Sequence, residues 1–181
     1  MATIYIDFDG VILDTNDLID DFRDIVRYKN NLSKDEDVEK YLNNMNWYGI
    51  LSRARIIENS INHIKQLQNE KLFKIIILTK YNTFTERASK DYIIKKLFNP
   101  NGIEIVFVPC YVHKCEVVCP KGNILIDDYI ENLIAWHQAG GIAIKFSDGN
   151  KISSFPRITN IGEITEKCYK LYPQRIKKSK I

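Results

Sequence analysis

The sequence DFDGVILDT, residues 7–15, follows the short apolar run at residues 4–6 and decides how the rest of the chain is interpreted. A β-rich apolar run that ends in acidic residues and a glycine is typical of a buried strand entering a loop. Asp7 and Asp9 stand directly after that run. We therefore expect a first β-strand whose carboxyl end presents two carboxylates.

Further apolar runs of strand length follow at residues 73–78, 103–108, 123–126 and 142–146. Helical segments separate them. The pattern Thr83-x-x-Glu86 caps a helix that extends to about residue 98, a second helix spans about 129–139 before Gly140, and Asn160 caps a last helix. Strands that alternate with helices imply right-handed crossovers and a mostly parallel sheet. Because the runs are apolar throughout, we expect an α/β fold with helices on both faces of the sheet.

The region between the first two strands has helical periodicity and no convincing strand. Apolar residues recur at helical spacing over residues 18–26 and again over residues 56–67, and Ser33-x-x-Glu36 has the form of a capping box. We expect an all-helical cap at residues 15–70, inserted into an α/β core made of residues 1–14 and 71–181.

The composition excludes several classes of protein. With 45% hydrophobic and 27% charged residues, the 181-residue chain is globular rather than disordered. The net charge of +3 is too small to indicate a nucleic-acid or membrane partner, and no apolar run approaches the roughly 18 residues of a membrane span. Two aspartates and no basic stretch among the first ten residues argue against a secretory signal, so we expect a cytoplasmic protein.

Polar side chains follow four of the expected strands. They are Asp7 and Asp9 after the first, Thr79 and Lys80 after the second, His113 and Lys114 after the third, and Asp127 and Asp128 after the fourth. The carboxyl ends of parallel strands meet at one edge of a sheet, where ligands bind. Carboxylates gathered there repel one another unless a cation or protonation relieves them, and oxygen ligands suit Mg²⁺. The sequence therefore predicts a magnesium site at this edge.

In this order the motifs resemble those of the haloacid dehalogenase-like (HAD) hydrolase superfamily. DFDGVILDT resembles the first motif, D-x-D-G-x-x-x-D-T/S, and ILTK at residues 77–80 resembles the second. ILIDDYIEN at residues 124–132 resembles the fourth, with the form D-D-x-x-x-N. The resemblance covers roughly residues 1–15 and 71–150. It implies a Rossmann-like core with a type-1 cap inserted after the first strand.

The resemblance also implies a role for each matching residue. Asp7 would be the nucleophile that takes a phosphoryl group, and Asp9 would be the general acid and base. Mg²⁺ would be held by Asp7, by the backbone carbonyl of Asp9 and by one carboxylate of the Asp127-Asp128 pair. Phosphate would be bound by Gly10, Thr79, Lys80 and Lys114. Dehalogenases of the superfamily lack the second acid, so Asp9 favours phosphate ester chemistry.

Two assignments rest on local spacing. Asp128 and Asn132 lie four apart at the start of a helix and can share a face, so we expect Asp128 to be the direct metal ligand and Asp127 to support it. The basic third motif is either Lys114 or Lys121. We favour Lys114 because it follows a strand, whereas Lys121 precedes one in a Pro-Lys-Gly turn.

Within the superfamily the chain is most similar to the type-C 5′-nucleotidase and 5′(3′)-deoxyribonucleotidase group. The similarity rests on the short helical cap and on KCEVVCPKGNILIDD at residues 114–128, and Lys80 departs from the Thr-Ser pair common in that group. We expect a Mg²⁺-dependent phosphatase of a small phosphorylated metabolite, with a nucleotide as one candidate. A sugar-phosphate phosphatase, a phosphomutase-like transferase and a non-catalytic phosphate-binding regulator stay open, and a homodimer is compatible with the sequence.

The cap is expected to select the substrate because it covers the site. Its candidate contacts are an aromatic pair and two arginines, namely Trp47, Tyr48, Arg53 and Arg55. Phe22 is in phase with the apolar positions of its helix and is expected in the core.

The cysteines raise a separate question. Cys110, Cys115 and Cys119 cluster with His113 at spacings that are unusual for a zinc site, so zinc binding is left open there and free thiols are expected, as at Cys168. The basic tail, residues 174–181, is expected to be a solvated terminus.

Overall fold

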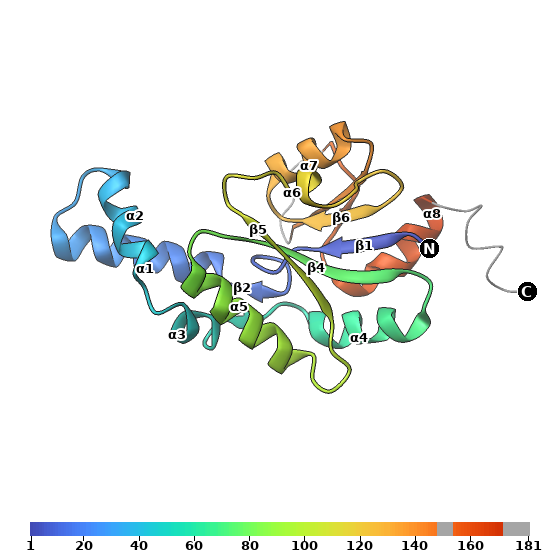
Figure 1. Ribbon diagram of the computed structural model, residues 1–181, viewed down its shortest axis with the longest axis horizontal. Coiled ribbons are helices and arrows are strands. Elements are labelled where there is room, and N and C mark those ends of the chain that lie inside the picture. The colour runs from blue at the N-terminus through green and yellow to red at the C-terminus, as the bar shows by residue number, and fades with distance from the viewer. Residues whose placement is uncertain (148–153, 172–181) are drawn as a thin grey trace, which may run out of the picture.

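The fold is built around β1 (Thr3–Ile6), which lies inside a six-stranded parallel sheet of order β5-β4-β1-β6-β7-β8 (Figure 1). The computed structural model describes residues 1–147 and 154–171. β1 pairs with β4 (Lys74–Tyr81) on one side and with β6 (Ile124–Asp127) on the other. The outer strands are β5 (Glu104–Pro109), β7 (Ile142–Phe146) and β8 (Arg157–Ile158). The expected α/β fold with a mostly parallel sheet is confirmed.

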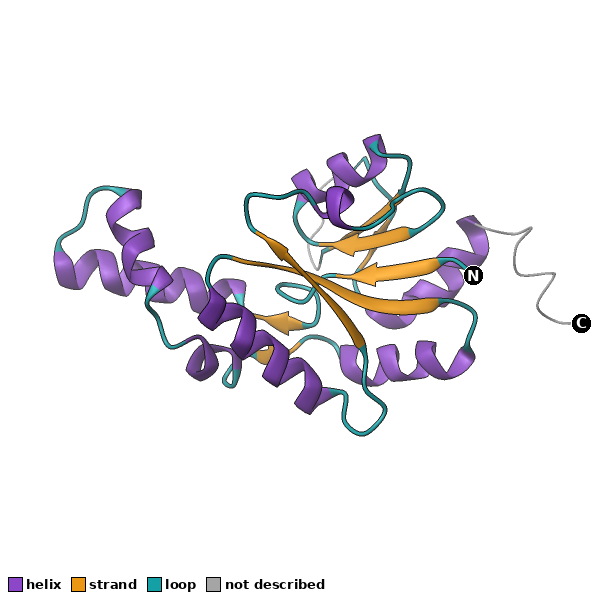
Figure 2. Ribbon diagram, in the orientation of Figure 1, coloured by secondary structure: helices purple, strands orange, loops and turns teal. Residues whose placement is uncertain are grey.

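Alternate residues of each inner strand enter two different hydrophobic clusters. Ile4 and Ile77 belong to one cluster, and Tyr5 and Ile76 belong to the other. Helices cover both faces of the sheet (Figure 2). One face packs against α4 (Ser60–Glu70), α5 (Phe84–Leu97) and α8 (Ile164–Leu171), and the other against α6 (Lys114–Val117) and α7 (Ile130–Gln138). Burial on both faces explains why the strands are apolar throughout.

Two of the three expected capping residues cap a helical segment. The Thr83 side chain accepts a hydrogen bond from the backbone N–H of Glu86, and Asn160 caps the short 3₁₀ turn η1 (Ile161–Glu163) that leads into α8. The helix expected at Ser33 does begin there, but Ser33 is not its capping residue. Lys34 is the N-cap of α2 (Asp35–Asn43) and makes no side-chain capping bond, so the acidic first turn of that helix takes over the stabilising role.

The inserted region contains α1 (Asn16–Asn30), α2 and α3 (Trp47–Leu51). The α1–α2 segment protrudes from the core at the left of Figure 1, and α3 lies beside α5. These helices share their own cluster around Val38 and Leu42, against which Phe22 packs as expected. The insertion is not all-helical. β2 (Leu13–Asp14) pairs antiparallel with β3 (Arg55–Ile56), and two-residue strands are too short to leave a periodic pattern.

The packing of α4 bears on where the cap ends. Its residues Ile61, Ile64 and Leu67 belong to the cluster of the sheet, not to that of α1–α3. The division at residues 14/15 and 70/71 stays a prediction, and this packing favours a second boundary before α4.

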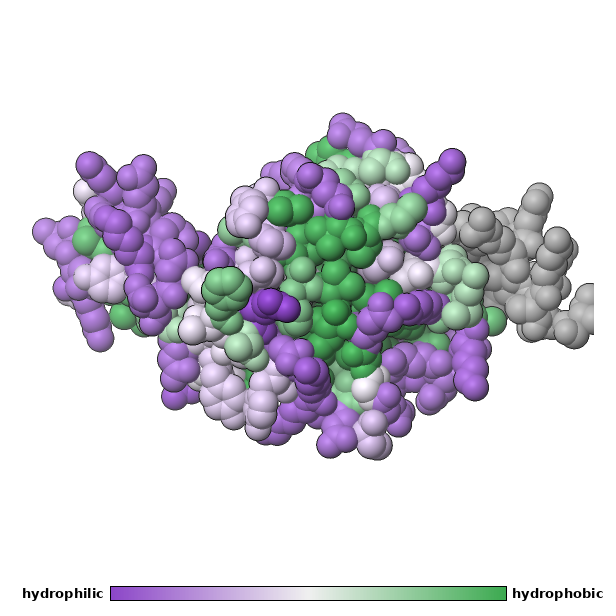
Figure 3. Space-filling view, viewed as in Figure 1, coloured by the Kyte–Doolittle hydropathy of each residue, from purple (hydrophilic) through white to green (hydrophobic). Residues whose placement is uncertain are grey.

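The surface follows the same division. In Figure 3 hydrophobic residues gather at the centre of the face, over the sheet, and hydrophilic residues cover the protruding α1–α2 segment. Within residues 1–147 and 154–171, no helix combines the length and the apolar character needed to cross a membrane. The basic tail at residues 174–181 lies outside the described residues, and so does the side chain of Cys168.

Candidate active site

A tight turn after β1 presents the two aspartates of the first motif. The backbone N–H groups of Ile12 and Leu13 both donate to the carbonyl of Phe8, and the residues of this turn are largely buried. Gly10 has a φ of +67°, and a Cβ at this position would lie 2.2 Å from Oδ2 of Asp128. The turn therefore needs glycine for its conformation and for the close approach of the fourth motif.

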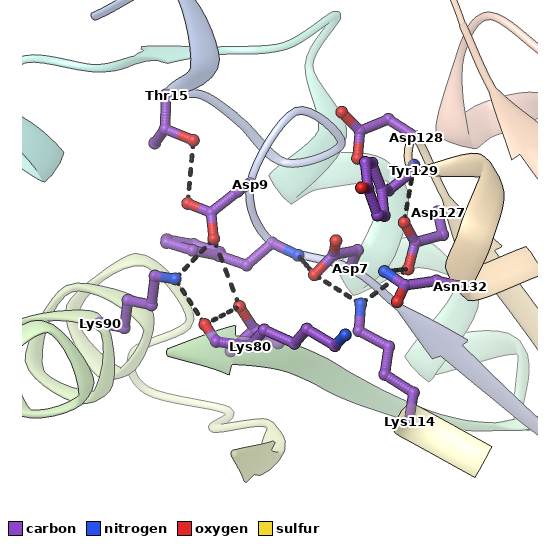
Figure 4. Close-up of polar contacts among 12 residues, drawn as sticks. Asp7, Asp9, Thr15, Lys80, Lys90, Lys114, Asp127, Asp128, Tyr129 and Asn132 are labelled. Carbon is purple, nitrogen blue, oxygen red and sulfur yellow. Dashed lines mark hydrogen bonds and ion pairs between the residues drawn. The ribbon is translucent and has the colours of Figure 1, made fainter. Parts of the chain in front are cut away.

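Lys114 joins the first motif to the fourth. Its Nζ lies 2.9 Å from Oδ1 of Asp7 and 2.7 Å from Oδ2 of Asp127, and its side chain is 1% exposed (Figure 4). Burial alone lowers the pKa of this ammonium, but the two carboxylates raise it above its ordinary value, so Lys114 is charged. Lys121 is exposed in the turn before β6, at the opposite end of the strand. The structure thus brings Lys114, and not Lys121, to Asp7.

The two acids of the fourth motif have different surroundings. Asp127 is fully buried and accepts hydrogen bonds from Lys114, from the backbone N–H of Tyr129 and from Nδ2 of Asn132 at 3.0 Å. Asp128 accepts a hydrogen bond from Asn16, at the start of the cap. The expectation that Asn132 shares a face with Asp128 was wrong, because α7 begins only at Ile130 and the turn before it directs Asp127 toward the helix.

Three carboxylates converge at this point. Ligand oxygens of Asp7, Asp127 and Asp128 all lie within 4.8 Å of one another, and no other group of three or more acidic, His or Cys residues among the described residues meets this test. Burial, reinforced by the neighbouring carboxylates, raises the pKa of Asp7 to about 8 against the opposing effect of Lys114. Burial and Asp127 raise the pKa of Asp128 to about 6. Clustered oxygen donors whose charges oppose one another fit a hard divalent cation such as Mg²⁺.

Asp9 lies on the other side of the turn, in a second network. Its Oδ1 accepts a hydrogen bond from Thr15 at 2.9 Å, and its Oδ2 lies 2.6 Å from Nζ of Lys90 (Figure 4). Lys90 also lies 2.6 Å from Oε1 of Glu86. Burial lowers the pKa of Lys90, but Asp9 and Glu86 raise it above its ordinary value. Thr79 is fully buried at the end of β4, with Oγ1 3.4 Å from Asp9.

Sequence reasoning missed Lys90 and Glu86. Both are buried on α5, at helical spacing with the core residues Ile93 and Ile94. Charged residues within the apolar stripe of a helix were the available signal, because such residues are rarely buried unless they are paired.

Two cavities lie beside the carboxylates. One, of about 250 Å³, extends between cap and core, and its lining includes Asp9, Asn16, Trp47, Lys80 and Lys90. Figure 4 shows the Lys80 side chain extending from the end of β4 toward the part of the site that holds Lys114. The other cavity, of about 330 Å³, lies beyond Asp128 and is lined by Arg55 and Lys145 among others.

Comparison with solved structures identifies the architecture. A subfamily IA HAD-superfamily hydrolase from Geobacter sulfurreducens aligns over 92% of this chain and 99% of its own length, with a TM-score of 0.63 and 12% identity. A HAD phosphatase from Thermococcus onnurineus aligns over 93% and 98%, with a TM-score of 0.62 and 14% identity. The chain has the HAD hydrolase fold.

A magnesium-bound HAD hydrolase from Bacillus subtilis shows the same likeness, with a TM-score of 0.58 and 13% identity over 94% of this chain and 97% of its own length. No family model matches the sequence, and no curated protein matches it either. At these identities the likeness concerns the HAD fold and leaves the 5′-nucleotidase subgroup as a prediction.

The cap of this HAD fold brings only part of the expected substrate residues to the site. Trp47 lines the cavity between cap and core, and Arg55 lines the other cavity while paired with Asp14 at 2.7 Å. Tyr48 packs against Tyr92 of α5, with ring centroids 5.6 Å apart. Arg53 is exposed and lines neither of these cavities.

Proposed function

We propose that the protein is a Mg²⁺-dependent phosphatase that hydrolyses a small phosphomonoester through a phosphorylated Asp7. The observation that carries this proposal is the position of Lys114, whose buried ammonium lies between Asp7 and Asp127 next to a third carboxylate. A buried cation beside a nucleophilic carboxylate lowers the repulsion between that carboxylate and a phosphate dianion.

Asp7 and Asp128 would hold the metal, together with the backbone carbonyl of Asp9, and Asp127 would support them through Lys114 and Asn132. Mg²⁺ bound there would offset the charge of the carboxylates and of the entering phosphate. The phosphate oxygens would be bound by Thr79, Lys80 and Lys114 and by backbone groups of the turn at Gly10.

The residues of the chain account for both chemical steps. An oxygen of Asp7 attacks phosphorus, and the bond between phosphorus and the ester oxygen breaks while the Asp9 carboxyl gives its proton to that oxygen. A water molecule then attacks phosphorus, its proton passes to Asp9, and the bond between phosphorus and Asp7 breaks. Phosphate leaves, and both carboxyl groups return to their starting states.

The cavity of about 250 Å³ is where we place the leaving group, because Asp9 and Lys80 line it beside Trp47. Its volume suits a sugar or a nucleoside rather than a macromolecule. A 5′-nucleotide is therefore one candidate substrate, with Trp47 against the base. We propose a small phosphorylated metabolite as the partner and no nucleic acid.

A panel of phosphate esters, including nucleotides and sugar phosphates, tests the proposal when each is assayed with Mg²⁺ and with EDTA. We expect phosphate release with Mg²⁺ that disappears in EDTA and in the Asp7→Asn variant. Binding of phosphate esters without any release would contradict the proposal and favour a regulatory protein on the same fold.

A further inference from the structure

The network around Lys90 has a feature that the proposed chemistry does not explain. Nζ of Lys90 lies 2.6 Å from Asp9, 2.6 Å from Glu86 and 2.7 Å from the backbone carbonyl of Lys80. The Lys90 side chain is only 3% exposed, and that of Glu86 only 4%. A lysine of α5 is thus held in the core by the carboxylate that would move the proton.

A second ion pair on the same helix shows what a purely helical role looks like. Lys95 lies 2.7 Å from Asp91, also four residues apart, but their side chains are 68% and 37% exposed. Such a pair stabilises a helix without desolvating two charges. Burying the Lys90–Glu86 pair is costly and is not by itself a source of stability, so its position calls for a further reason.

That reason lies in how the Asp9 carboxylate is held. Thr15, next to the cap, donates to Oδ1 at 2.9 Å, and Lys90, from the core, contacts Oδ2. Glu86 is in turn fixed by the backbone N–H of Asn82 at 2.7 Å. Donors on both oxygens fix the plane of the carboxylate, and Asp9, Glu86 and Lys90 all line the cavity between cap and core.

We propose that Lys90, supported by Glu86, is a positioning residue that aims the Asp9 carboxyl group at the leaving-group oxygen of the substrate. The inference rests on the proposed phosphatase function. Lys90 acts through Asp9, which gives its proton to the ester oxygen as the bond to phosphorus breaks. Substrates whose leaving group needs that proton therefore depend on Lys90, and substrates with a stable leaving anion do not.

The test compares kcat/KM for an alkyl phosphate, glycerol phosphate, with that for an aryl phosphate, p-nitrophenyl phosphate. For a two-step hydrolysis this parameter reports the transfer of the phosphoryl group to the enzyme, where Asp9 acts as the acid. We expect Lys90→Met to lower kcat/KM for the alkyl ester about 10-fold or more beyond its effect on the aryl ester, within the 10²–10⁴-fold range of proton-transfer catalysis. Lys90→Arg, which keeps the charge, should lose less, and Lys95→Met should match the wild type.

A double-mutant cycle with Asp9→Asn separates positioning from folding. If Lys90 acts through Asp9, Lys90→Met should change kcat/KM by less than about 2-fold when Asp9→Asn is already present. Lys90→Met leaves the buried Glu86 carboxylate without its counter-ion, so the variant Lys90→Met/Glu86→Gln is measured in parallel, with melting temperatures in EDTA to show folding.

Equal loss for both esters in the folded variants, or full additivity with Asp9→Asn, would overturn the inference while leaving the phosphatase proposal intact. A wild-type protein that hydrolyses neither ester nor any member of the wider panel would overturn the proposed function, and this inference with it.

Discussion

Two buried lysines lie on opposite sides of the turn after β1, and each is clamped between two carboxylates. Lys114 contacts Asp7 and Asp127, and Lys90 contacts Asp9 and Glu86. The difference is the third carboxylate. Asp128 has a ligand oxygen within 4.8 Å of those of Asp7 and Asp127, so that side carries three carboxylates against two ammonium groups, that of Lys114 and that of Lys145, which donates to the backbone carbonyl of Asp128.

The difference in charge separates two kinds of chemistry. Around Lys114, burial and the neighbouring carboxylates together raise the pKa of Asp7 to about 8, and the excess of carboxylates leaves a place for a divalent cation. Around Lys90 the two carboxyl groups accept hydrogen bonds from Thr15 and from the backbone of Asn82, so their orientation is fixed without a metal. We infer that the metal acts on the Lys114 side and that proton transfer belongs to the Lys90 side.

The largest expected effect comes from Asp7. Asp7→Asn should reduce phosphate release on the order of 10⁴-fold or more, because an amide is a poor nucleophile. Asp14→Asn is a matched control, since Asp14 lies in β2, directly after the same turn, and pairs with Arg55. Near-normal turnover in Asp7→Asn would exclude a phosphorylated Asp7.

Lys114 comes next. Lys114→Met should lower kcat by about 10²–10³-fold, the usual cost of removing one electrostatic group at a developing charge. The matched control is Lys121→Met, because Lys121 is exposed at the far end of β6 and should leave kcat unchanged. Loss of activity in the Lys121 variant alone would reverse the assignment of the third motif.

The choice between these two lysines shows what the sequence could predict. Parallel strands send their carboxyl ends to one edge, so Asp7, Asp9, Thr79 and the Asp127-Asp128 pair could be placed together from strand order alone. The hydrogen-bond partner of Asn132 could not be predicted. It depends on the residue at which α7 begins, and a sequence pattern gives that position only to within one or two residues.

The other contacts that could not be predicted depend on how the helices pack. Lys90 reaches Asp9 through the packing of α5, and the cap residues depend on how α1–α3 pack against one another. Neither kind of contact follows from strand order. Of the expected cap residues, Trp47 lines the cavity beside Asp9, whereas Tyr48 packs on α5.

The fourth motif offers a smaller effect. Asp128→Asn should weaken Mg²⁺ binding, measured by calorimetry, by about 10-fold, because it removes one of the two side-chain carboxylates proposed as direct ligands. Asp127→Asn should mainly lower the melting temperature in EDTA, since Asp127 anchors Lys114, Asn132 and the turn at Tyr129. Loss of Mg²⁺ affinity in the Asp127 variant only would exchange the roles of the two acids.

The smallest effect is one of pH on stability. The pKa of Asp7 is raised from 3.8 to about 8 in the folded protein, so the folded state holds a proton that the unfolded chain releases. Without metal, the contribution of Asp7 to the free energy of unfolding should therefore be largest below about pH 4 and should be lost as the pH rises toward 8. Thermal melts in EDTA at pH 5 and 8 should differ by several degrees, and Asp7→Asn or Mg²⁺ should reduce the difference. If the melting temperature changed with pH to the same extent in the wild type and in Asp7→Asn, the pKa of Asp7 would not be raised in the folded protein.

The most direct test of the account is to trap the phosphorylated protein. The Asp9→Asn variant is mixed with p-nitrophenyl phosphate and Mg²⁺, quenched in acid, digested and analysed by mass spectrometry. We predict a phosphoryl group on the peptide that contains Asp7, and none in EDTA or in the variant that also carries Asp7→Asn. Mg²⁺-dependent release of nitrophenol with no label on this peptide, or with label on another residue, would contradict the account.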